Sequence, residues 1–302
     1  MKFIPHFCVV LNAVIWGLVW IPMQWLDSKG LSVIWATFFS YLALSGLLLF
    51  ARPSLLLNTL QSKTLLLMGI AYGLTNICFN WAVTNGDVVR VVFLFYLMPI
   101  WAAIFAKIFL SEDLGYKGWI RIFLALTGLM IVLNIFDQLS IELKINFYEI
   151  VAIFGGVFFA LGNVFLRKAH SFSSFERSFS IFLGSCFVPF TLLTISFLFS
   201  ESTFFTDPFE NLKNLMYLNF SSILGILFLM ILILGTANFC LQYGGSKILV
   251  QTTTLLMLLE IPVATISLAF VTNKLTEKSV FIGGGLIVIT AIWASFDQNR
   301  IK

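Results

Sequence analysis

The chain has 302 residues, of which 60% are apolar and 11% are charged, whereas roughly 25% of the residues of an ordinary soluble domain are charged. The formal net charge of +4 is too small to indicate a protein that binds nucleic acid. The composition therefore argues against a soluble enzyme and predicts an all-α integral membrane protein.

Charged residues, glycines and prolines divide the sequence into ten apolar segments. Each segment is close to the length of about 20 residues that a helix needs to cross a bilayer. The segments are apolar on nearly all sides, as expected for helices surrounded by lipid or by other helices. The expected spans are residues 6–26, 32–51, 64–84, 88–110, 118–136, 148–167, 177–199, 217–242, 248–271 and 279–296. A polar connection at residues 200–216 is expected outside the membrane.

The distribution of basic residues predicts the orientation, because Lys and Arg accumulate in cytoplasmic loops. With ten spans and a cytoplasmic N-terminus, 12 of the 18 Lys and Arg residues fall on the cytoplasmic side and 6 fall outside. We therefore expect a multi-pass protein with both termini in the cytoplasm.

The third and eighth expected spans resemble each other. At an offset of 162 residues, identical residue types coincide: Gly73, Asn76 and Cys78 with Gly235, Asn238 and Cys240. With one further residue inserted, Pro99 of the fourth span coincides with Pro262 of the ninth. Five spans per half would place the second half in the membrane in the opposite orientation, an architecture typical of secondary transporters. The sequence thus predicts ten transmembrane helices as two inverted five-helix repeats, at residues 6–136 and 148–296.

Glu260 is the main candidate for a functional residue. It lies near the middle of the ninth expected span, where a charge costs roughly 3 kcal/mol. One interpretation is a cavity carboxylate that binds a cationic group of a substrate or carries a proton. The alternative is a protonated or hydrogen-bonded residue that only packs between helices.

Other polar residues within the spans have two interpretations each. Arg90, near the outer end of the fourth span, would attract anionic substrate groups or only anchor its helix at the interface. A stripe of small and amide side chains on the third span and another on the eighth would line a wet cavity or form tight helix contacts. The amides of these stripes are Asn76, Asn80, Asn238 and Gln242. Weaker candidates for the cavity are Asn12, Trp16, Trp20, Tyr96 and Asn163.

Several activities lack their sequence signatures. The chain has no GxxxxGK[ST] motif, so ATP-driven transport is not expected. His6 and His170 lie at the ends of spans, which disfavours an intramembrane serine protease. We identify no catalytic residues, no metal ligands and no cofactor site, and we expect a protein that is not an enzyme.

Residues in or beside the first, fourth and ninth spans also carry a family resemblance. The residues concerned are Trp16-Gly17, the segment 90–99, Glu112, and Glu260-Ile261-Pro262. On these residues, and over about residues 8–136 and 148–296, the chain resembles the EamA-type ten-span branch of the drug/metabolite transporter superfamily. One departure is the segment 272–276, which lacks a counterpart of Glu112.

The resemblance implies a permease of the bacterial inner membrane that moves small organic metabolites such as amino acids, commonly outward. It implies a central cavity lined by the first, third, fourth, sixth, eighth and ninth spans. We expect alternating access around that cavity, a small-molecule substrate, membrane lipid as a partner, proton coupling, no nucleic acid, and a monomer or homodimer. The alternatives are a lipid-handling or scramblase-like protein with a groove open to lipid and, less favoured, an intramembrane lipid-modifying enzyme.

Overall fold

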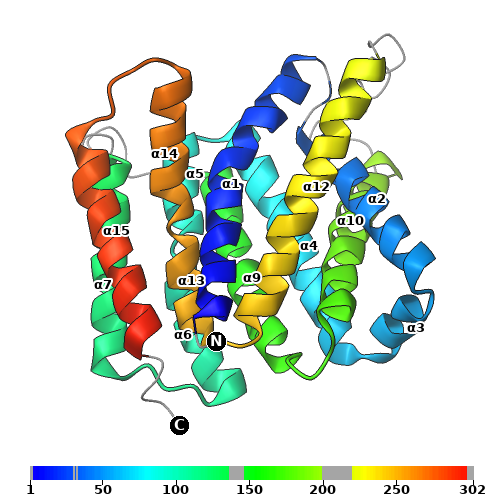
Figure 1. Cartoon of the computed structure of the whole chain (residues 1–302), viewed down its shortest axis with the longest axis horizontal. Coiled ribbons are helices and arrows are strands. Elements are labelled where there is room, and N and C mark those ends of the chain that lie inside the picture. Colours follow the sequence, from blue (N-terminus) through cyan, green and yellow to red (C-terminus); the bar gives the residue numbers. More distant parts are fainter. Residues whose placement is uncertain (1–2, 30, 32, 136–145, 199–219, 298–302) are drawn as a thin grey trace.

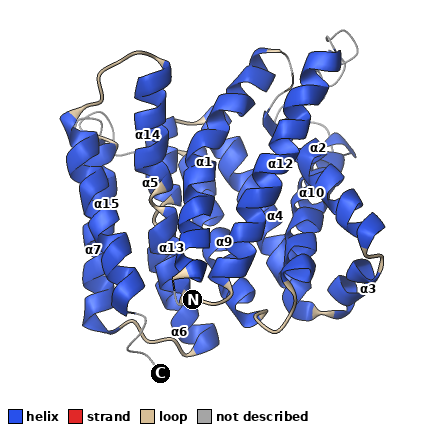
Figure 2. Ribbon diagram, viewed as in Figure 1, coloured by secondary structure: helices blue, strands red, loops and turns tan. Residues whose placement is uncertain are grey.

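The computed structural model describes residues 3–29, 31, 33–135, 146–198 and 220–297. Within these residues every regular element is a helix (Figure 2). The helices are α1 (Ile4–Ser28), α2 (Val33–Ala51), α3 (Ser54–Gln61), α4 (Lys63–Asn85), α5 (Val88–Phe95), α6 (Met98–Leu110), α7 (Gly115–Val132), α9 (Phe147–Lys168), α10 (Ser174–Leu198), α12 (Phe220–Gly245), α13 (Val250–Met257), α14 (Glu260–Val271) and α15 (Lys278–Asp297).

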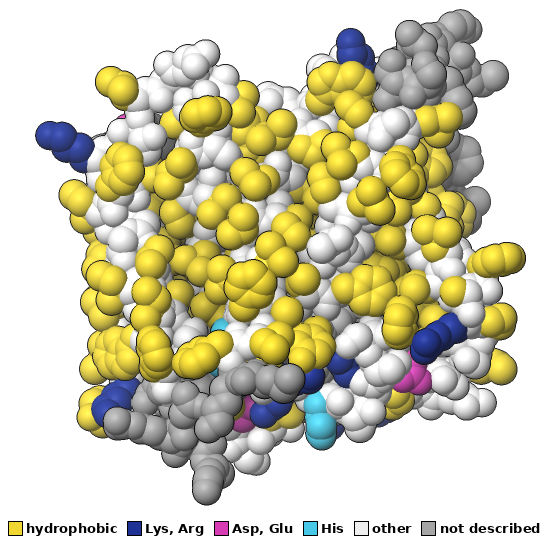
Figure 3. Space-filling model, in the orientation of Figure 1, with side chains coloured by type: hydrophobic (Ala, Val, Ile, Leu, Met, Phe, Trp, Pro, Cys, Tyr) yellow, Lys and Arg dark blue, Asp and Glu magenta, His cyan; other side chains and the backbone are white. Residues whose placement is uncertain are grey.

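The predicted all-helical membrane fold is confirmed. Eight helices or broken helices of the described chain are long and apolar enough to cross a membrane, and α2 with α3, bent by 109°, makes a ninth candidate. The seventh expected span overlaps α10 (Ser174–Leu198), which is not among these candidates, so the count of ten spans stays a prediction. Hydrophobic side chains cover the middle of the face drawn in Figure 3, with Lys and Arg near its upper and lower edges. The predicted connection at residues 200–216, and residues 32, 136, 199 and 217–219 at the edges of expected spans, lie outside the described residues.

Helix α1 begins, and α15 ends, at the same end of the bundle (Figure 1). We call this the terminal end. The start of α1 and the end of α15 therefore lie on the same side of the bundle, and the assignment of that side to the cytoplasm stays a prediction from the basic residues.

The fourth and ninth spans are both broken near their prolines. The fourth is divided into α5 and α6 just before Pro99, and the ninth into α13 and α14 just before Pro262. Proline has no N–H, so the carbonyl four residues earlier loses its helical hydrogen bond. A break at this depth is tolerated where the backbone is covered by protein rather than by lipid.

A glycine of a neighbouring helix covers each break. A Cβ atom at Gly156 of α9 would lie 2.5 Å from the carbonyl oxygen of Phe95, and a Cβ atom at Gly17 of α1 would lie 2.8 Å from the carbonyl oxygen of Glu260. Small residues permit such close helix contacts in membrane proteins. The first helix of each half thus packs on the broken span of the other half: α9 on the fourth span and α1 on the ninth. This matched arrangement is consistent with the predicted inverted repeat.

The larger helix pairings follow the same pattern. Helix α1 packs against α12, and α9 packs against α4, so the first span of each half lies along the third span of the other. These pairings place the two broken spans and the amide-bearing helices α4 and α12 around one central region, where the candidate site lies.

Candidate functional site

A cavity lies in this central region. The space open to the centre of a water molecule is about 80 Å³, which is room for a few ordered waters. Its wall is mainly aromatic, and both halves of the chain contribute to it. The aromatic lining residues are Trp16, Tyr41, Tyr72, Phe79, Phe95, Tyr96 and Phe159, and the polar ones besides the tyrosines are Thr75, Asn76, Asn238 and Glu260.

Glu260 and Tyr96 meet in this cavity. Tyr96 lies in the break between α5 and α6, and Glu260 is the first residue of α14. Their side chains both line the cavity and interact there, so the two broken spans meet at the level of their breaks. Glu260 is the one charged residue among the described lining residues.

The two repeat-related asparagines lie on another part of the same wall. Asn238 Nδ2 donates to the carbonyl of Leu234 at 2.9 Å and lies 3.4 Å from the hydroxyl of Tyr41. Asn76 Nδ2 donates to Ser185 Oγ at 2.8 Å, and its amide also interacts with the Tyr41 hydroxyl. The amides from the two halves therefore converge on a single tyrosine of α2.

Five of the eleven predicted site residues line the cavity and six do not. The five that line it are Trp16, Asn76, Tyr96, Asn238 and Glu260. The six that are absent from its lining are Asn12, Trp20, Asn80, Arg90, Asn163 and Gln242. A role in substrate binding stays a prediction for all eleven residues.

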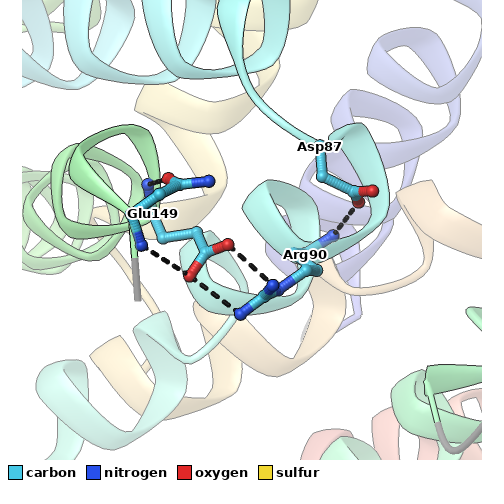
Figure 4. Close-up of polar contacts among 4 residues, drawn as sticks. Asp87, Arg90 and Glu149 are labelled. Atoms are coloured by element: carbon cyan, nitrogen blue, oxygen red, sulfur yellow. Dashed lines mark hydrogen bonds and ion pairs between the residues drawn. The ribbon is translucent and has the colours of Figure 1, made fainter. Parts of the chain in front are cut away.

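The structure places Arg90 in an ion pair between α5 and α9. Figure 4 shows its guanidinium directed at Glu149, with Nε 2.9 Å from Oε1 and Nη2 3.1 Å from Oε2. The Glu149 side chain is only 1% exposed, whereas that of Arg90 is 27% exposed. Asp87 caps α5 by accepting from the Arg90 backbone N–H. Of the two interpretations of Arg90, the geometry favours a structural one over a vestibule residue.

Trp20 and Asn80 lie on the side of the cavity that faces away from the terminal end. The indole N–H of Trp20 donates to Ser267 Oγ at 3.0 Å, which links α1 to α14. Asn80 is half-buried on α4, and its carbonyl accepts from the Thr84 hydroxyl.

Asn163 and Gln242 belong to a second group of buried polar residues, which we call the polar ring: Asn12, Asn163, Gln242 and Thr253. All four are at most 1% exposed. Each lies on the same helix as a cavity-lining residue, four positions or about 6 Å closer to the terminal end. Those lining residues are Trp16, Phe159, Asn238 and Met257, respectively.

The polar ring is incompletely hydrogen-bonded. Asn12 Nδ2 donates to the carbonyl of Ala237, and Asn163 Nδ2 to that of Phe159. The side-chain oxygens of Asn12 and Asn163 and both polar side-chain atoms of Gln242 are buried without a partner in the described structure. Buried polar groups without partners are unfavourable unless water reaches them.

A second ion pair lies beyond the polar ring at the terminal end. Glu112 Oε1 lies 3.2 Å from Arg167 Nε, and Glu112 Oε2 accepts from the backbone N–H of Val250 at 3.3 Å. Arg167 also donates to the carbonyl of Ser246 at 2.9 Å. Glu112 thus joins the first half of the chain to α9 and to the start of α13.

The second half has no equivalent contact at the matching position. An offset of 163 residues, the one that relates Pro99 to Pro262, places Leu275 opposite Glu112, and Leu275 is 98% exposed. The departure noted in segment 272–276 therefore corresponds to a missing helix-end contact at this position.

Several lining residues were not predicted from the sequence, Tyr41 above all. Tyr41 is 1% exposed and is the point at which both asparagines meet. Its signal in the sequence was a hydroxyl-bearing aromatic residue in the middle of the second apolar span. Within the described residues, no group of three or more His, Cys, Asp or Glu side chains is placed to hold a metal ion.

Comparison with known families bears on the first half of the chain. Residues 3–134 match the model of the EamA-like transporter family. The chain is EamA-like over these residues. The predicted resemblance is confirmed there, whereas the second repeat at residues 148–296 stays a prediction. The match over these residues and the apolar helices together indicate a multi-pass membrane protein whose first part is similar to this transporter family.

Solved structures support the fold over the whole chain. Twenty-five chains of solved structures match it. One, described only as "Crystal structure of protein", is 15% identical, covers 98% of this chain and 98% of its own, and has a TM-score of 0.68. At that identity the likeness shows the fold alone. No curated protein matches the chain.

Proposed function

We propose that the protein is a secondary transporter that moves a small organic metabolite, such as an amino acid or a related compound, by alternating access around the central cavity. The observation that carries the proposal is the convergence of Glu260, Tyr96, Asn76 and Asn238 on one cavity from both halves of the chain. A membrane protein retains a carboxylate at mid-depth mainly where it faces a cavity or a partner.

The chemistry of the wall suggests how a substrate would be held. Aromatic rings bury the apolar part of a small molecule, and a few placed polar groups determine its orientation. Asn76 and Asn238 would hydrogen-bond to its polar groups. Glu260 would bind a cationic group or take up a proton when the substrate leaves, which would couple transport to the proton gradient.

The polar ring supports a path from the cavity toward the terminal end. Its unpartnered atoms lie directly below the cavity, and an opening on that side would let water or substrate reach them. The Glu112–Arg167 pair then lies where such a path would leave the protein. In the present conformation the ring is packed shut, so this structure would represent a state closed at the terminal end.

The proposal is tested by flux in proteoliposomes. The Glu260→Gln variant keeps the shape and removes the ionisable group, so we expect loss of transport or loss of its dependence on a pH gradient, with normal folding. The matched control is Glu277→Gln, the same change at an exposed carboxylate between α14 and α15. Unchanged flux and unchanged pH dependence in Glu260→Gln would remove the assignment.

The interior position of the polar residues also favours a transporter over the two alternatives, a scramblase-like protein and a lipid-modifying enzyme. A scramblase needs a polar groove open to lipid, and a lipid-modifying enzyme needs a pair of reactive groups near lipid. Reconstituted protein that moved fluorescent phospholipids between leaflets at a rate unaffected by Glu260→Gln would favour the lipid-handling alternative over the transporter.

A further inference from the structure

A second hollow lies on the outside of the bundle, between α3, α4 and α10. It provides about 330 Å³ of space open to the centre of a water molecule. Its wall is almost entirely apolar, and side chains from all three helices form it: Leu56 and Leu60 of α3, Leu66 and Ile70 of α4, and Leu183 and Phe187 of α10. Leu60, Ile70 and Phe187 are 46–59% exposed. We call this hollow the α3 groove.

The backbone contacts of α4 and α10 form the floor of the α3 groove. Gly69 of α4 and Gly184 of α10 face each other there, and a Cβ atom on either would collide with the backbone of the other helix. Close approach of two helices through glycines leaves a furrow beside the contact. Side chains that stand on both sides of the contact, such as Ile70 and Phe187, form the walls of that furrow.

Helix α3 forms the end of the groove nearest the terminal side. The chain bends by 109° between α2 and α3, and Figure 1 shows α3 at the edge of the bundle, near the terminal end. Leu55 and Thr59 of α3 are buried against the bundle, whereas Leu57 and Leu60 are exposed. An eight-residue apolar helix is too short to cross a membrane by itself, and its bend away from α2 is the arrangement expected of a helix at the depth of the lipid head groups.

One polar group in the groove has no partner. Thr59 lines the groove and is 1% exposed, and its hydroxyl is buried beside the groove without a hydrogen-bond partner within the described structure. The other hydroxyl in the lining, that of Ser180, donates to the carbonyl of Leu65. Thr59 therefore offers a donor to whatever occupies the groove.

Basic residues flank α3 on both sides. Lys63 is exposed and lies between Leu60 and Leu65, both of which line the groove. Arg52, just before α3, is exposed, with its guanidinium carbon 4.4 Å from the ring centroid of Phe175.

The acidic residue near α3 is already engaged. Glu176 accepts from Asn58 and from the Ser173 hydroxyl and backbone N–H. It also lies beside the buried guanidinium of Arg177. The flank of the groove therefore presents uncompensated positive charge, at the depth where anionic lipid head groups lie.

We propose that the α3 groove binds an acyl chain of an anionic phospholipid from the leaflet at the terminal end. The apolar wall takes the chain, the Thr59 hydroxyl donates to an ester carbonyl, and the Lys63 ammonium pairs with the phosphate. This site is separate from the central cavity and does not depend on what is transported.

The lipid would act on the cavity through α4 and α10. The groove floor joins these helices at Gly69 and Gly184, and further along the same pair Ser185 of α10 accepts a hydrogen bond from Asn76 at 2.8 Å. An occupant of the groove restrains the α4–α10 contact. It thereby restrains the helix that carries a cavity amide.

The test uses the full chain in detergent, with phosphatidylglycerol as the anionic probe and phosphatidylcholine of the same chains as the neutral one. We expect phosphatidylglycerol to raise the unfolding temperature and native mass spectrometry to show one retained lipid. Lys63→Gln should reduce the shift at least twofold, while Lys274→Gln, an exposed lysine at the opposite end of the bundle, should not. Equal shifts with both lipids, or equal behaviour of the two lysine variants, would overturn the proposal.

Thr59→Val provides an independent arm that preserves shape. Removing an unpartnered buried hydroxyl should leave the lipid-free protein as stable as before or more stable, and should weaken retention of phosphatidylglycerol. Retention equal to that of the unmodified protein would contradict the role of Thr59 and, with it, the proposed pose. A third variant, Ile70→Trp, changes the wall of the groove. If it converted a dimer to a monomer without affecting lipid retention, the occupant of the groove would be a second copy of the chain, and the proposal would be wrong.

Discussion

The guanidinium of Arg90 lies 2.9 Å from the carboxylate of Glu149, and this contact joins the first half of the chain to the second at the end of the bundle opposite the termini. The Glu112–Arg167 pair joins the same two spans at the terminal end. The charges are arranged in opposite order, with the arginine on the fourth span in one pair and on α9 in the other. The fourth and sixth spans are thus clamped at both ends.

Loss of Arg90 should lower stability rather than substrate affinity. Arg90→Met would leave the buried Glu149 without its cation, and breaking a buried pair costs about 3 kcal/mol, less here because Arg90 is partly exposed. Unfolding in detergent measures the effect. The double variant Arg90→Met/Glu149→Gln should recover part of the loss. A raised KM for an anionic substrate with unchanged stability would instead restore the vestibule interpretation.

Tyr96 and Glu260 should act as one unit in transport. Tyr96→Phe removes the hydroxyl that bonds to the carboxyl, so flux should fall in the unmodified background. In the Glu260→Gln background the same change should have a much smaller effect, because the interaction is already altered. A double-mutant cycle on initial rates in proteoliposomes measures this coupling. Independent, additive effects would show that the two side chains do not cooperate.

The glycines over the helix breaks should not tolerate a methyl group. Gly156→Ala would place a Cβ atom 2.5 Å from the Phe95 carbonyl oxygen, and Gly17→Ala would place one 2.8 Å from that of Glu260. Overpacking of this kind typically costs about 1–3 kcal/mol. We expect lower unfolding temperatures and reduced flux for both variants.

The control for these glycines is Gly285→Ala in α15. A Cβ atom at Gly285 meets nothing within 4 Å, and alanine in a helix is favoured over glycine by about 1 kcal/mol. Its stability should be equal or higher. Similar destabilisation at all three positions would show that the contacts over the breaks have no special role.

Weakening the ion pair at the terminal end should open the polar ring to water. Glu112→Gln removes the charge that faces Arg167 and weakens the cap on α13. Because the pair is partly exposed, the closed arrangement of that end should lose about 1 kcal/mol or less of stability. Thr253→Cys in a background without the four native cysteines reports access to the ring. Faster labelling by a membrane-impermeant thiol reagent applied at the terminal side is expected. Unchanged labelling would place the closing contact elsewhere.

The sequence by itself indicated most of the spans, because the length of an apolar segment acts locally on the helix that contains it. The depth of Glu260 and the position of Pro99 and Pro262 within the fourth and ninth spans follow from such counting, whereas the helix breaks at these prolines are seen in the structure. The similarity between the third and eighth spans also identified Asn76 and Asn238 as candidate cavity residues. The direction of each side chain could not be derived in the same way, since a helix that is apolar on all sides has no polar face to show which residues turn inward.

Only the tertiary structure decided which polar residues meet. It brought Asn76 and Asn238 to Tyr41 and placed Gln242 and Asn163 below the cavity instead of on its wall. It also directed Arg90 to Glu149, 59 positions away in the chain. These relationships depend on the rotation of each helix about its axis. That rotation is set by contacts such as those of Gly17 and Gly156 with other helices, and no single span contains that information.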